Sequence, residues 1–354
     1  MSKVTDTIAL LNKTLGSEVT TGGDNQLKNE YWSTGILPLD ALLGGGFQKR
    51  RMALLAGESA TLKSMIGLAT AGQVQRNGGT AAIIDTEHAF NPDWATALGI
   101  DVDELIISRP KTGEEAVDQM EILIRNDVDY ICMDSIATLL PKAERDIMLS
   151  GKDNIQPARI AALMAVGLRR LNTANENTCI VWVSQMRDNL GAMAFSPKTI
   201  ITGGKSIHYY VSQSVKLTKV GKLVQDVEYY NGDKNAKDKQ IIVQQFKAEL
   251  SKSRNTQPFA IQHFNFDLRG GVIDTPQYLI QQGLDMGVVQ RPNNRTWNVE
   301  IPNTETGEIL YETSVTGKDA FAAEVYENKE LQNHLIDAVA GRYNLDPEVY
   351  KWNE

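Results

Sequence analysis

Cysteine is scarce in this chain: only Cys132 and Cys179 occur among its 354 residues, and both stand inside apolar runs. Two such thiols are typical of core positions in a cytosolic protein, and they argue against a scaffold held by disulfides. Long apolar runs are absent as well, since no stretch approaches the roughly 18 residues of a membrane helix. The N-terminal stretch MSKVTDTIALLNKTLGSE carries charges through its apolar part and has no cleavage site, unlike a secretory signal. These absences predict a cytoplasmic protein without a membrane partner.

Positive charge is also in short supply. Lysine and arginine number 36 against 44 aspartates and glutamates, which gives a net charge of −8. Because phosphate binding draws on lysine and arginine, this balance argues mildly against a nucleic-acid partner. Net charge governs long-range steering, however, whereas binding depends on where the basic groups lie. A DNA-binding function therefore has to be supported by local clusters of cations.

Five short apolar runs have the length and composition of fully buried strands, and helix-like stretches separate several of them. These runs are Met52–Ala56, Thr80–Asp85, Leu105–Ser108, Asp129–Asp134 and Cys179–Ser184. Their alternation with helices is typical of an α/β fold in which helices cover both faces of a largely parallel sheet.

Two helix starts are marked clearly. Thr112 and Glu115 form a T-x-x-E capping box ahead of a helix that ends near Asn126. Pro157 is suited to the first turn of a second helix. The apolar face of this second helix carries Ile160, Leu163, Met164, Leu168 and Leu171.

Beyond Tyr209 the pattern changes to longer strands, which we expect to be antiparallel, with a turn around Gly232. They are Tyr210–Thr218, Gln240–Phe246 and Phe259–Phe266. From about Leu268 short helices follow, with a hairpin around Asn303–Gly307 and a final helix from about Glu330. We therefore expect a core at residues 31–263 and a small α+β domain at residues 264–354. Residues 1–30 hold a short amphipathic helix and a strand-like piece, Glu18–Thr21, and these need another surface to pack against.

A phosphate-binding loop is only partly present, because its second glycine is missing. The pattern G-x-x-x-x-G-K-[ST] is approached, after an apolar strand, by Gly57, Glu58, Ser59, Ala60, Thr61, Leu62, Lys63 and Ser64. Such a loop wraps backbone N–H groups around phosphates, with Lys63 neutralising charge and the Ser64 hydroxyl on Mg²⁺. Leu62 stands where a missing Cβ normally allows close approach, so we expect a slightly shifted loop with Leu62 packed outward. The competing interpretation is a strand, turn and helix in which Lys63 and Ser64 are incidental.

Acidic side chains follow two other predicted strands. Asp134 is placed to hold a water of the Mg²⁺ shell, although a strand-terminal aspartate can also cap the next turn. Glu87 follows the strand that ends at Asp85, and it is the candidate to orient or deprotonate an attacking water. Ligands of open parallel sheets bind at the carboxyl ends of the strands, which is where both acids stand. We expect His88 to pack or hydrogen-bond rather than to catalyse.

These motifs, in this order, resemble those of the RecA-type DNA recombinase family over about residues 33–266. Ser33–Asp40, leading to three glycines, is similar to the family's approach to its phosphate loop. The resemblance implies an ATPase core of that family and gives Glu87 the role of catalytic glutamate. It makes Trp94 the ring that stacks on adenine, while Asn91 replaces an acid that normally meets the adenine amino group.

Two further motifs imply contact with a neighbouring subunit and with DNA. Ser184–Arg187 resembles the strand end where a glutamine senses the γ-phosphate, which gives Gln185 that role. Lys252 and Arg254 resemble a pair of lysines that the family offers to the ATP of the neighbouring subunit, and a planar guanidinium suits phosphate well. The bulky Leu62 and the later Gly-Gly and E-T-G-E patterns resemble the phage subgroup typified by UvsX. That subgroup would place the protein in the cytoplasm of a phage host.

The cations that DNA binding requires gather in and near two predicted loops, Arg145–Gln156 and Met186–Lys205. Cations there would bind phosphates, and apolar side chains would intrude between the bases of single-stranded DNA. The resemblance makes Leu190 such a wedge. The candidate DNA-binding residues are Arg145, Lys152, Arg169, Arg187, Leu190, Lys198, Gly203, Gly204 and Lys205. The competing interpretation is a set of solvated side chains on surface loops.

The resemblance implies an ATP-dependent recombinase that forms a helical filament on single-stranded DNA and pairs it with homologous duplex DNA. It would hydrolyse ATP with Mg²⁺, and a single-strand-binding protein and a loading mediator are further expected partners. The N-terminal helix would pack on the adjacent subunit, and Glu18–Thr21 would add a strand to its sheet, unless this segment is a frayed tail. Two other classes stay open: a ring-forming helicase with the same core, and a DNA-coating protein that no longer hydrolyses ATP.

Overall fold

The computed structural model describes residues 2–16, 19–24, 28–145, 158–188, 199–231, 234–268, 271–303 and 306–351. Two compact units, Met1–Glu30 and Tyr31–Glu354, make up the chain. The predicted division into three parts stays a prediction. In the described parts of the chain, no helix is both long enough and apolar enough to cross a membrane.

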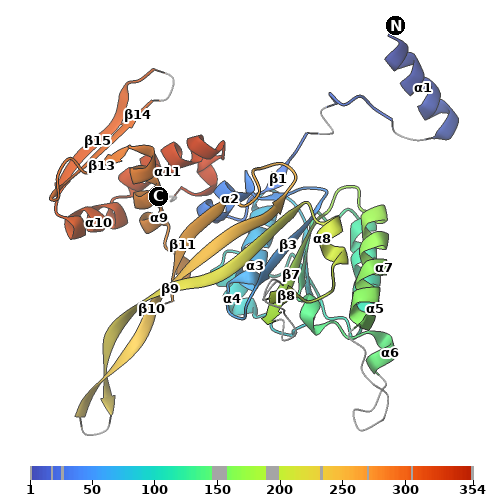
Figure 1. Ribbon diagram of the computed structural model, residues 1–354, viewed down its shortest axis with the longest axis horizontal. Helices are drawn as coiled ribbons and strands as arrows, with labels where there is room; N and C mark the ends of the chain where they lie inside the picture. The colour runs from blue at the N-terminus through green and yellow to red at the C-terminus, as the bar shows by residue number, and fades with distance from the viewer. Residues whose placement is uncertain are drawn as a thin grey trace, which may run out of the picture. The chain divides into compact units, whose positions relative to one another are not determined.

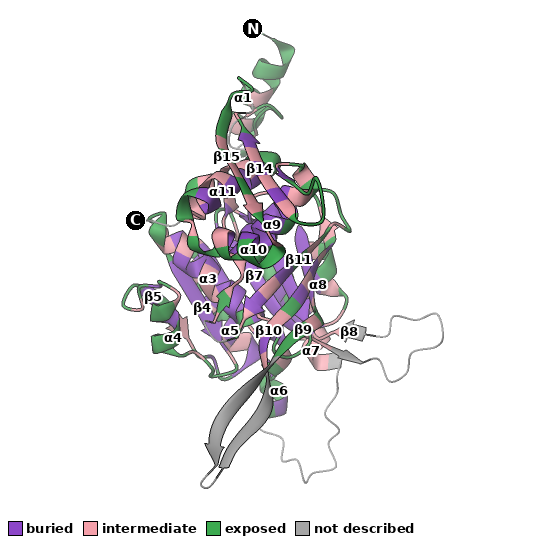
Figure 2. Ribbon diagram, turned by 90° about the vertical axis from the view of Figure 1, so that its left-hand side faces the viewer, coloured by how far each residue is buried: buried purple, intermediate pink, exposed green. Residues whose placement is uncertain are grey.

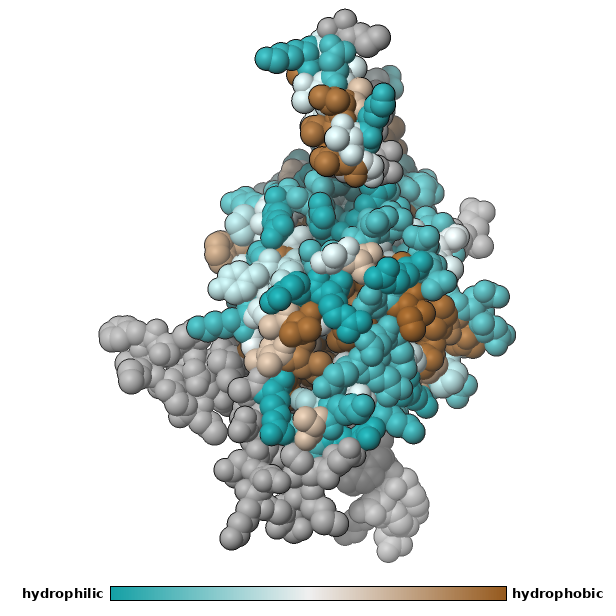
Figure 3. Space-filling model, turned by 90° about the vertical axis from the view of Figure 1, so that its right-hand side faces the viewer, coloured by the Kyte–Doolittle hydropathy of each residue, from teal (hydrophilic) through white to brown (hydrophobic). Residues whose placement is uncertain are grey.

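The N-terminal unit holds α1 (Lys3–Leu15), whose ends are both capped. Ser2 accepts a hydrogen bond from the backbone N–H of Thr5 at 3.3 Å, and Gly16 ends the helix in the left-handed conformation. Several apolar side chains of α1 are exposed, and Figure 3 shows them gathered on the helix. The expected amphipathic helix is therefore confirmed.

The strand expected at Glu18–Thr21 is not formed in the single chain, because the described residues 19–21 are not in a strand. Asn12 of α1 instead holds Val19, donating to its carbonyl at 3.0 Å and accepting from its N–H at 2.7 Å. A lone strand has no partner for its backbone groups, and the described part of this unit offers no second strand.

A large sheet organises the second unit, with strand order β12-β11-β10-β9-β3-β7-β6-β4-β5 and β8 paired to β7. Its parallel centre consists of β3 (Met52–Gly57), β4 (Ala81–Asp85), β5 (Leu105–Ser108), β6 (Tyr130–Asp134) and β7 (Cys179–Asp188). All five predicted strands are formed, but β5 is not fully buried, because it lies at the edge of the sheet and Ile106 is 41% exposed. Because these strands are parallel, their carboxyl ends meet at one edge of the sheet.

Long antiparallel strands extend this sheet on one side. They are β9 (Gln213–Asn231), β10 (Lys234–Ser253), β11 (Ile261–Asp267) and β12 (Val272–Ile273). β9 pairs antiparallel with β10 but parallel with β3, so the expectation of purely antiparallel strands is corrected at this junction. The turn expected around Gly232 connects β9 to β10, although residues 232 and 233 lie outside the described residues.

Helices cover both faces of the sheet (Figure 1). One face packs against α2 (Leu37–Leu43), α3 (Lys63–Arg76) and α4 (Pro92–Ala97). The other packs against α5 (Gly113–Arg125), α7 (Ala158–Ala174) and α8 (Ser206–Tyr210). Figure 2 shows the strands between these layers as largely buried. Cys132 and Cys179 are among the buried residues and are free thiols, as expected.

The caps of α5 and α7 follow the sequence signals in part. The Thr112 hydroxyl accepts the N–H of Glu115 at 3.2 Å, as predicted. The Glu115 carboxylate accepts the N–H of Lys111 at 2.8 Å, so the reciprocal bond closes one residue before the expected position. Pro157 lies outside the described residues, while Met164, Leu168 and Leu171 of α7 are buried as expected.

Three segment boundaries differ from the expectation. Tyr210 belongs to α8, and the following strand begins at Gln213, where it pairs with Ala53 of β3. Phe259 has a φ of 65° and precedes β11, so it does not start that strand. The end of β7 pairs antiparallel with β8 (Thr199–Ile201), and Met186 faces Ile201. The second predicted DNA loop therefore rises from a two-stranded ribbon.

The C-terminal elements form their own hydrophobic cluster around Trp297 and Phe321. The rings of these two residues are stacked, and their centroids lie 4.8 Å apart. The elements are α9 (Thr275–Met286), β13 (Val289–Gln290), β14 (Thr296–Pro302), β15 (Ile309–Thr316), α10 (Lys318–Glu327), α11 (Lys329–Tyr343) and the 3-10 helix η3 (Pro347–Val349). The hairpin expected at residues 303–307 and the final helix are confirmed. Leu37 of α2 joins this cluster, and the Tyr350 hydroxyl donates to buried Asp40 at 2.7 Å. Both contacts tie the C-terminal elements to α2.

The remaining short elements flank these layers. They are β1 (Tyr31–Trp32), β2 (Phe47–Gln48), the 3-10 helix η2 (Ile136–Thr138) and α6 (Lys142–Arg145). The segment Ser33–Asp40 is fixed by Asp40, which accepts from the N–H of Thr34 at 2.9 Å and from its hydroxyl at 2.7 Å. Burial raises the pKa of Asp40 to about 6, and these donors oppose that rise.

Candidate functional site

The phosphate loop connects β3 to α3, as its sequence predicts. Ala60 and Leu62 both adopt left-handed backbone conformations, with φ of 53° and 65°. Residues that alternate in this way turn successive backbone N–H groups toward one concave side, which forms an anion-binding nest. The positive φ also explains why glycine is the usual residue at the position of Leu62. The side chain of Leu62 packs against the hydrophobic core, which confirms its expected outward position.

Lys63 is the buried cation of this loop. Its ammonium group donates to the carbonyl of Glu58 at 2.6 Å and to the Thr61 hydroxyl at 3.2 Å. Burial lowers the pKa of Lys63, whereas the charges of Asp134 and Glu87 raise it. The ammonium group is thus held at the nest by neutral oxygens, which a phosphate would replace.

Asp134 at the end of β6 is hydrogen-bonded to Ser64, which lies in the first turn of α3. Burial raises the pKa of Asp134 to about 6, and the charge of Glu87 adds to the rise, while a hydrogen bond from Ser64 opposes it. A hydroxyl and a carboxylate beside a phosphate nest supply the hard oxygen donors that Mg²⁺ prefers. These two side chains therefore fit the ion expected from the sequence.

Glu87 meets two side chains that come from other strands. Its Oε1 accepts from the Ser135 hydroxyl at 2.6 Å and from Gln185 Nε2 at 3.3 Å. The candidate base and the candidate γ-phosphate sensor are thus hydrogen-bonded to each other. Ser135 was not singled out by the sequence analysis, although its position directly after Asp134 was a signal that it would lie at this edge.

The loop that carries Glu87 is anchored by Asp85, a second residue that the sequence analysis did not assign to the site. Buried Asp85 accepts from the N–H groups of Ala89 at 3.0 Å and Phe90 at 3.2 Å. Its carboxylate also receives Arg109 Nε at 3.1 Å. Asp85 therefore holds the loop of residues 85–90 together on both sides of Glu87.

Trp94 and Asn91 lie on α4, beyond this loop. The side-chain oxygen of Asn91 accepts a hydrogen bond from the N–H of Trp94 at 3.1 Å and so caps α4. This oxygen is therefore already hydrogen-bonded within the chain. Trp94 is 38% exposed, and its ring approaches Gly271 so closely that a Cβ there would lie 2.8 Å away. The Trp94 ring and the backbone of Gly271 therefore lie close together.

Lys252 and Arg254 stand together at the end of β10. Lys252 Nζ donates to the carbonyl of His208, and Arg254 Nη2 donates to the carbonyl of Tyr209 at 3.3 Å. Burial and the charge of Arg254 lower the pKa of Lys252. These hydrogen bonds fix both cations on α8 rather than on the phosphate loop of the same chain.

The predicted DNA-binding residues divide into described and undescribed groups. Lys152, Leu190 and Lys198 lie outside the described residues, and so does the side chain of Arg187. Arg145 ends α6, Arg169 is exposed on α7, and Lys205 is exposed before α8. Gly203 and Gly204 have positive φ, and a Cβ on Gly203 would lie 2.8 Å from Ile136. Both glycines are therefore required by the turn that follows β8.

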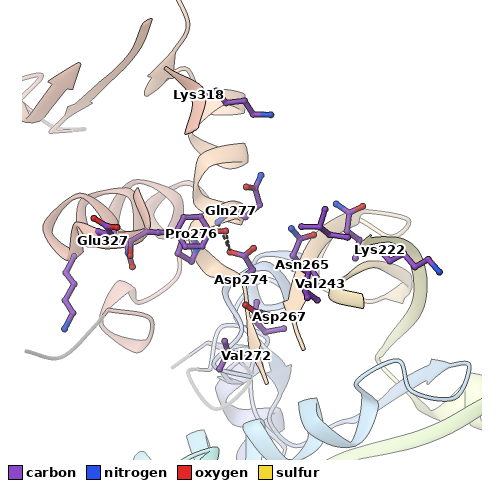
Figure 4. Close-up of a pocket in the computed structure, with 17 residues that line it drawn as sticks. Lys222, Val243, Asn265, Asp267, Val272, Asp274, Pro276, Gln277, Lys318 and Glu327 are labelled. Atoms are coloured by element: carbon purple, nitrogen blue, oxygen red, sulfur yellow. Dashed lines mark hydrogen bonds between the residues drawn. The ribbon is translucent and has the colours of Figure 1, made fainter. Parts of the chain in front are cut away.

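Two cavities flank β9. One of about 420 Å³ adjoins the phosphate loop, and Leu62 and Lys219 are among the residues that line it. The other, of about 1010 Å³, lies between β9–β12 and the C-terminal helices, where Figure 4 shows Lys222 and Lys318 at its margins. The larger cavity carries none of the predicted site residues.

Leu62→Gly tests whether the missing glycine harms the nucleotide site. Relief of the left-handed leucine should stabilise the fold by about 1 kcal/mol, and loss of the half-buried side chain should cost about 1–2 kcal/mol. We expect unfolding in urea to shift only slightly, and ATP affinity to change by less than about threefold. An activity that appears only in Leu62→Gly would instead identify the natural chain as a coating protein that binds DNA without hydrolysing ATP.

Comparisons with known proteins agree with this geometry. A family model described as the RecA N-terminal domain matches residues 2–272. The chain is 33% identical over 280 residues to Protein RecA of Rhodopirellula baltica, covering 78% of this chain and 70% of that one. It is 31% identical over 338 residues to the Corynebacterium glutamicum protein, covering 94% and 82%. It is 34% identical over 281 residues to the Rickettsia massiliae protein, covering 78% and 77%. These relatives are bacterial and give no support to the phage subgroup.

Proposed function

This chain belongs to the RecA family, and on that premise we propose that Glu87, Gln185 and the phosphate loop form an ATP-hydrolysing site that controls a filament on single-stranded DNA. The chain is an ATP-dependent DNA recombinase with DNA-dependent ATPase activity. The observation that carries the site assignment is the hydrogen bond between Gln185 and Glu87 beside the buried Lys63.

The geometry suggests how the residues divide the reaction. The nest and Lys63 would hold the β- and γ-phosphates, and a carboxylate at Glu87 would orient and deprotonate the attacking water. Ser135 and Gln185 keep that carboxylate at the sheet edge. Mg²⁺, held through Ser64 and Asp134, would neutralise phosphate charge.

Lys252 and Arg254 complete the site from a second subunit in this proposal. Their hydrogen bonds direct them to α8 of their own chain, which leaves their remaining N–H groups available for the phosphates of a neighbour. A site shared in this way forms only when subunits assemble, so hydrolysis would report filament formation. Trp94 and the turn at Gly271 would receive the adenine.

DNA would bind at the ends of β7 and α7 in the same filament. Gln185 lies on β7, whose end forms the ribbon with β8 below the second predicted loop. A shift of Gln185 toward a γ-phosphate would therefore move this ribbon directly. The residues proposed to bind DNA are Arg145, Lys152, Arg169, Arg187, Leu190, Lys198, Gly203, Gly204 and Lys205.

The remaining assignments rest on the family and the sequence. Homologous duplex DNA would be the second DNA partner, and a single-strand-binding protein and a loading mediator would assist. The N-terminal helix would join subunits. The protein would act in the cytoplasm, and the UvsX-like subgroup stays a prediction supported by Leu62 and the C-terminal glycine pattern.

Gln185→Ala tests the coupling between ATP and DNA. The wild-type protein should bind single-stranded DNA more tightly with ATP than with ADP, and electron microscopy should show helical filaments with ATP. The variant should still bind ATP, yet its DNA affinity should be the same with either nucleotide, because the link to the ribbon is removed. Equal wild-type affinity with ATP, ADP and no nucleotide would refute the coupling, and closed rings would favour a helicase.

A further inference from the structure

Lys219 stands beside the phosphate loop, although no sequence motif contains it. It lies on β9, which runs parallel to β3 with Leu217 paired to Gly57. Lys219 is therefore two residues beyond the level at which β3 ends. Val215 and Leu217 precede it on the same face of β9, and both pack in the core that includes α3. Lys219 continues this face at the level of the loop.

The side chain of Lys219 lines the cavity of about 420 Å³ together with Leu62, Lys63 and Ser64. The rest of the wall is mostly apolar and consists of Ala60, Thr61, Met65, Gln244, Phe246, Phe266 and Leu268. Lys219 is exposed, and in the described parts of the chain no hydrogen bond or ion pair holds its ammonium group. The positive charge of Lys219 also lowers the pKa of Lys63, although burial and the charges of Asp134 and Glu87 have larger effects on this pKa. An unpaired cation thus shares a cavity with the anion-binding nest.

The strand order gives this cation a definite place along a bound nucleotide. Glu87 follows β4 and Gln185 lies on β7, and both strands lie on one side of β3, while β9 lies on the other side. The cavity beside the nest extends toward β9, so a triphosphate whose γ-phosphate faces Gln185 can run across the nest into this cavity. The phosphate nearest to Lys219 is then the α-phosphate.

We propose that Lys219 binds the α-phosphate of the nucleotide as a second cation supplied by the same subunit. This inference rests on the proposed function, in which the Glu87–Gln185 edge receives the γ-phosphate. It adds a contact that distinguishes nucleotides by the presence of an α-phosphate rather than by the γ-phosphate. The contact also links the base of the β9–β10 hairpin to nucleotide binding.

The same strand offers a matched control. Lys222 is three residues further along β9 and lines the larger cavity instead, beside Leu223 (Figure 4). Lys219→Met and Lys222→Met remove the same charge from the same strand. Only the first should affect the nucleotide.

The test is an equilibrium titration of the full chain with Mg²⁺ and either ATP, ADP or adenosine, without DNA. We expect Lys219→Met to weaken ATP and ADP equally, by about tenfold, because one charge-assisted contact to phosphate is lost. Adenosine affinity should not change, Lys219→Arg should restore binding, and Lys222→Met should stay within about twofold of wild type. In hydrolysis assays Lys219→Met should raise KM and leave kcat nearly unchanged.

Equal nucleotide affinities for Lys219→Met and Lys222→Met would overturn the proposal. A loss confined to ATP would place the contact at the γ-phosphate and overturn it as well, and so would weaker DNA binding with unchanged nucleotide affinity. Failure of the proposed function is distinguishable, because the wild-type chain itself would then either bind no ATP or hydrolyse none.

Discussion

Glu87→Gln should bind ATP and single-stranded DNA like the wild-type protein while its ATP hydrolysis falls by about 10²–10⁴-fold. Glutamine keeps an oxygen that can accept from the Ser135 hydroxyl, which lies 2.6 Å from Glu87 Oε1 in the natural protein. The substitution removes only the capacity to take a proton from water. The measurement is steady-state phosphate release with saturating ATP and DNA, beside a filter-binding assay for DNA.

Glu104→Gln is a suitable control for this variant. Glu104 is an exposed carboxylate ahead of β5, so its neutralisation changes the net charge equally without touching the site. Its hydrolysis rate should match that of the wild type. Near-normal hydrolysis by Glu87→Gln would remove Glu87 from the mechanism and would favour another group as the base.

The position of Asp85 and Asp134 at one edge of the sheet could be predicted, because it follows from the direction of the strands. Gly57, Asp85 and Asp134 close apolar runs that were recognisable as buried parallel strands, and parallel strands place their carboxyl ends together. Asp85 and Asp134 are in fact paired in register across β4 and β6. The position of Gln185 at this edge came instead from the resemblance of Ser184–Arg187 to the family's strand-end motif.

Contacts that depend on side-chain direction could not be predicted in this way. The hydrogen bond from Ser135 to Glu87 joins residues that are 48 positions apart in the sequence, and no spacing rule relates them. Arg109 reaches Asp85 from the end of β5, where an arginine is usually a solvated side chain. The left-handed backbone conformation of Leu62 could not be predicted from the residue type either, because leucine rarely adopts this conformation.

The predicted ends of the strands were wrong where pairing between strands outweighs the secondary-structure preference of the individual residues. Tyr210 has the aromatic character of a strand residue, yet it ends α8, because the strand begins only where β3 offers a partner. The resemblance to the family starts the second predicted loop at Met186. In the fold, the backbone of Met186 pairs with Ile201 and belongs to a ribbon.

Lys252→Ala and Arg254→Ala should each lower DNA-stimulated ATP hydrolysis by about 10²–10³-fold, because a cation aimed at the transferring phosphoryl group is lost. Nucleotide binding by the isolated subunit should be nearly unchanged, since both side chains bind α8 of their own chain. Lys247→Ala is the control, because Lys247 lies on the same strand and pairs with Glu249 at 2.9 Å. Its hydrolysis rate should stay close to that of the wild type.

A mixing experiment separates a shared site from a self-contained one. Glu87→Gln lacks the base but keeps Lys252 and Arg254, whereas Arg254→Ala keeps the base but lacks one cation. In a shared site, an Arg254→Ala subunit whose ATP faces a Glu87→Gln neighbour has every group that it needs. Random assembly of equal amounts should therefore restore roughly a quarter of the wild-type rate, because each contact joins two different surfaces of the subunits. A site complete within one chain would stay inactive in every mixture, since neither variant contains both groups.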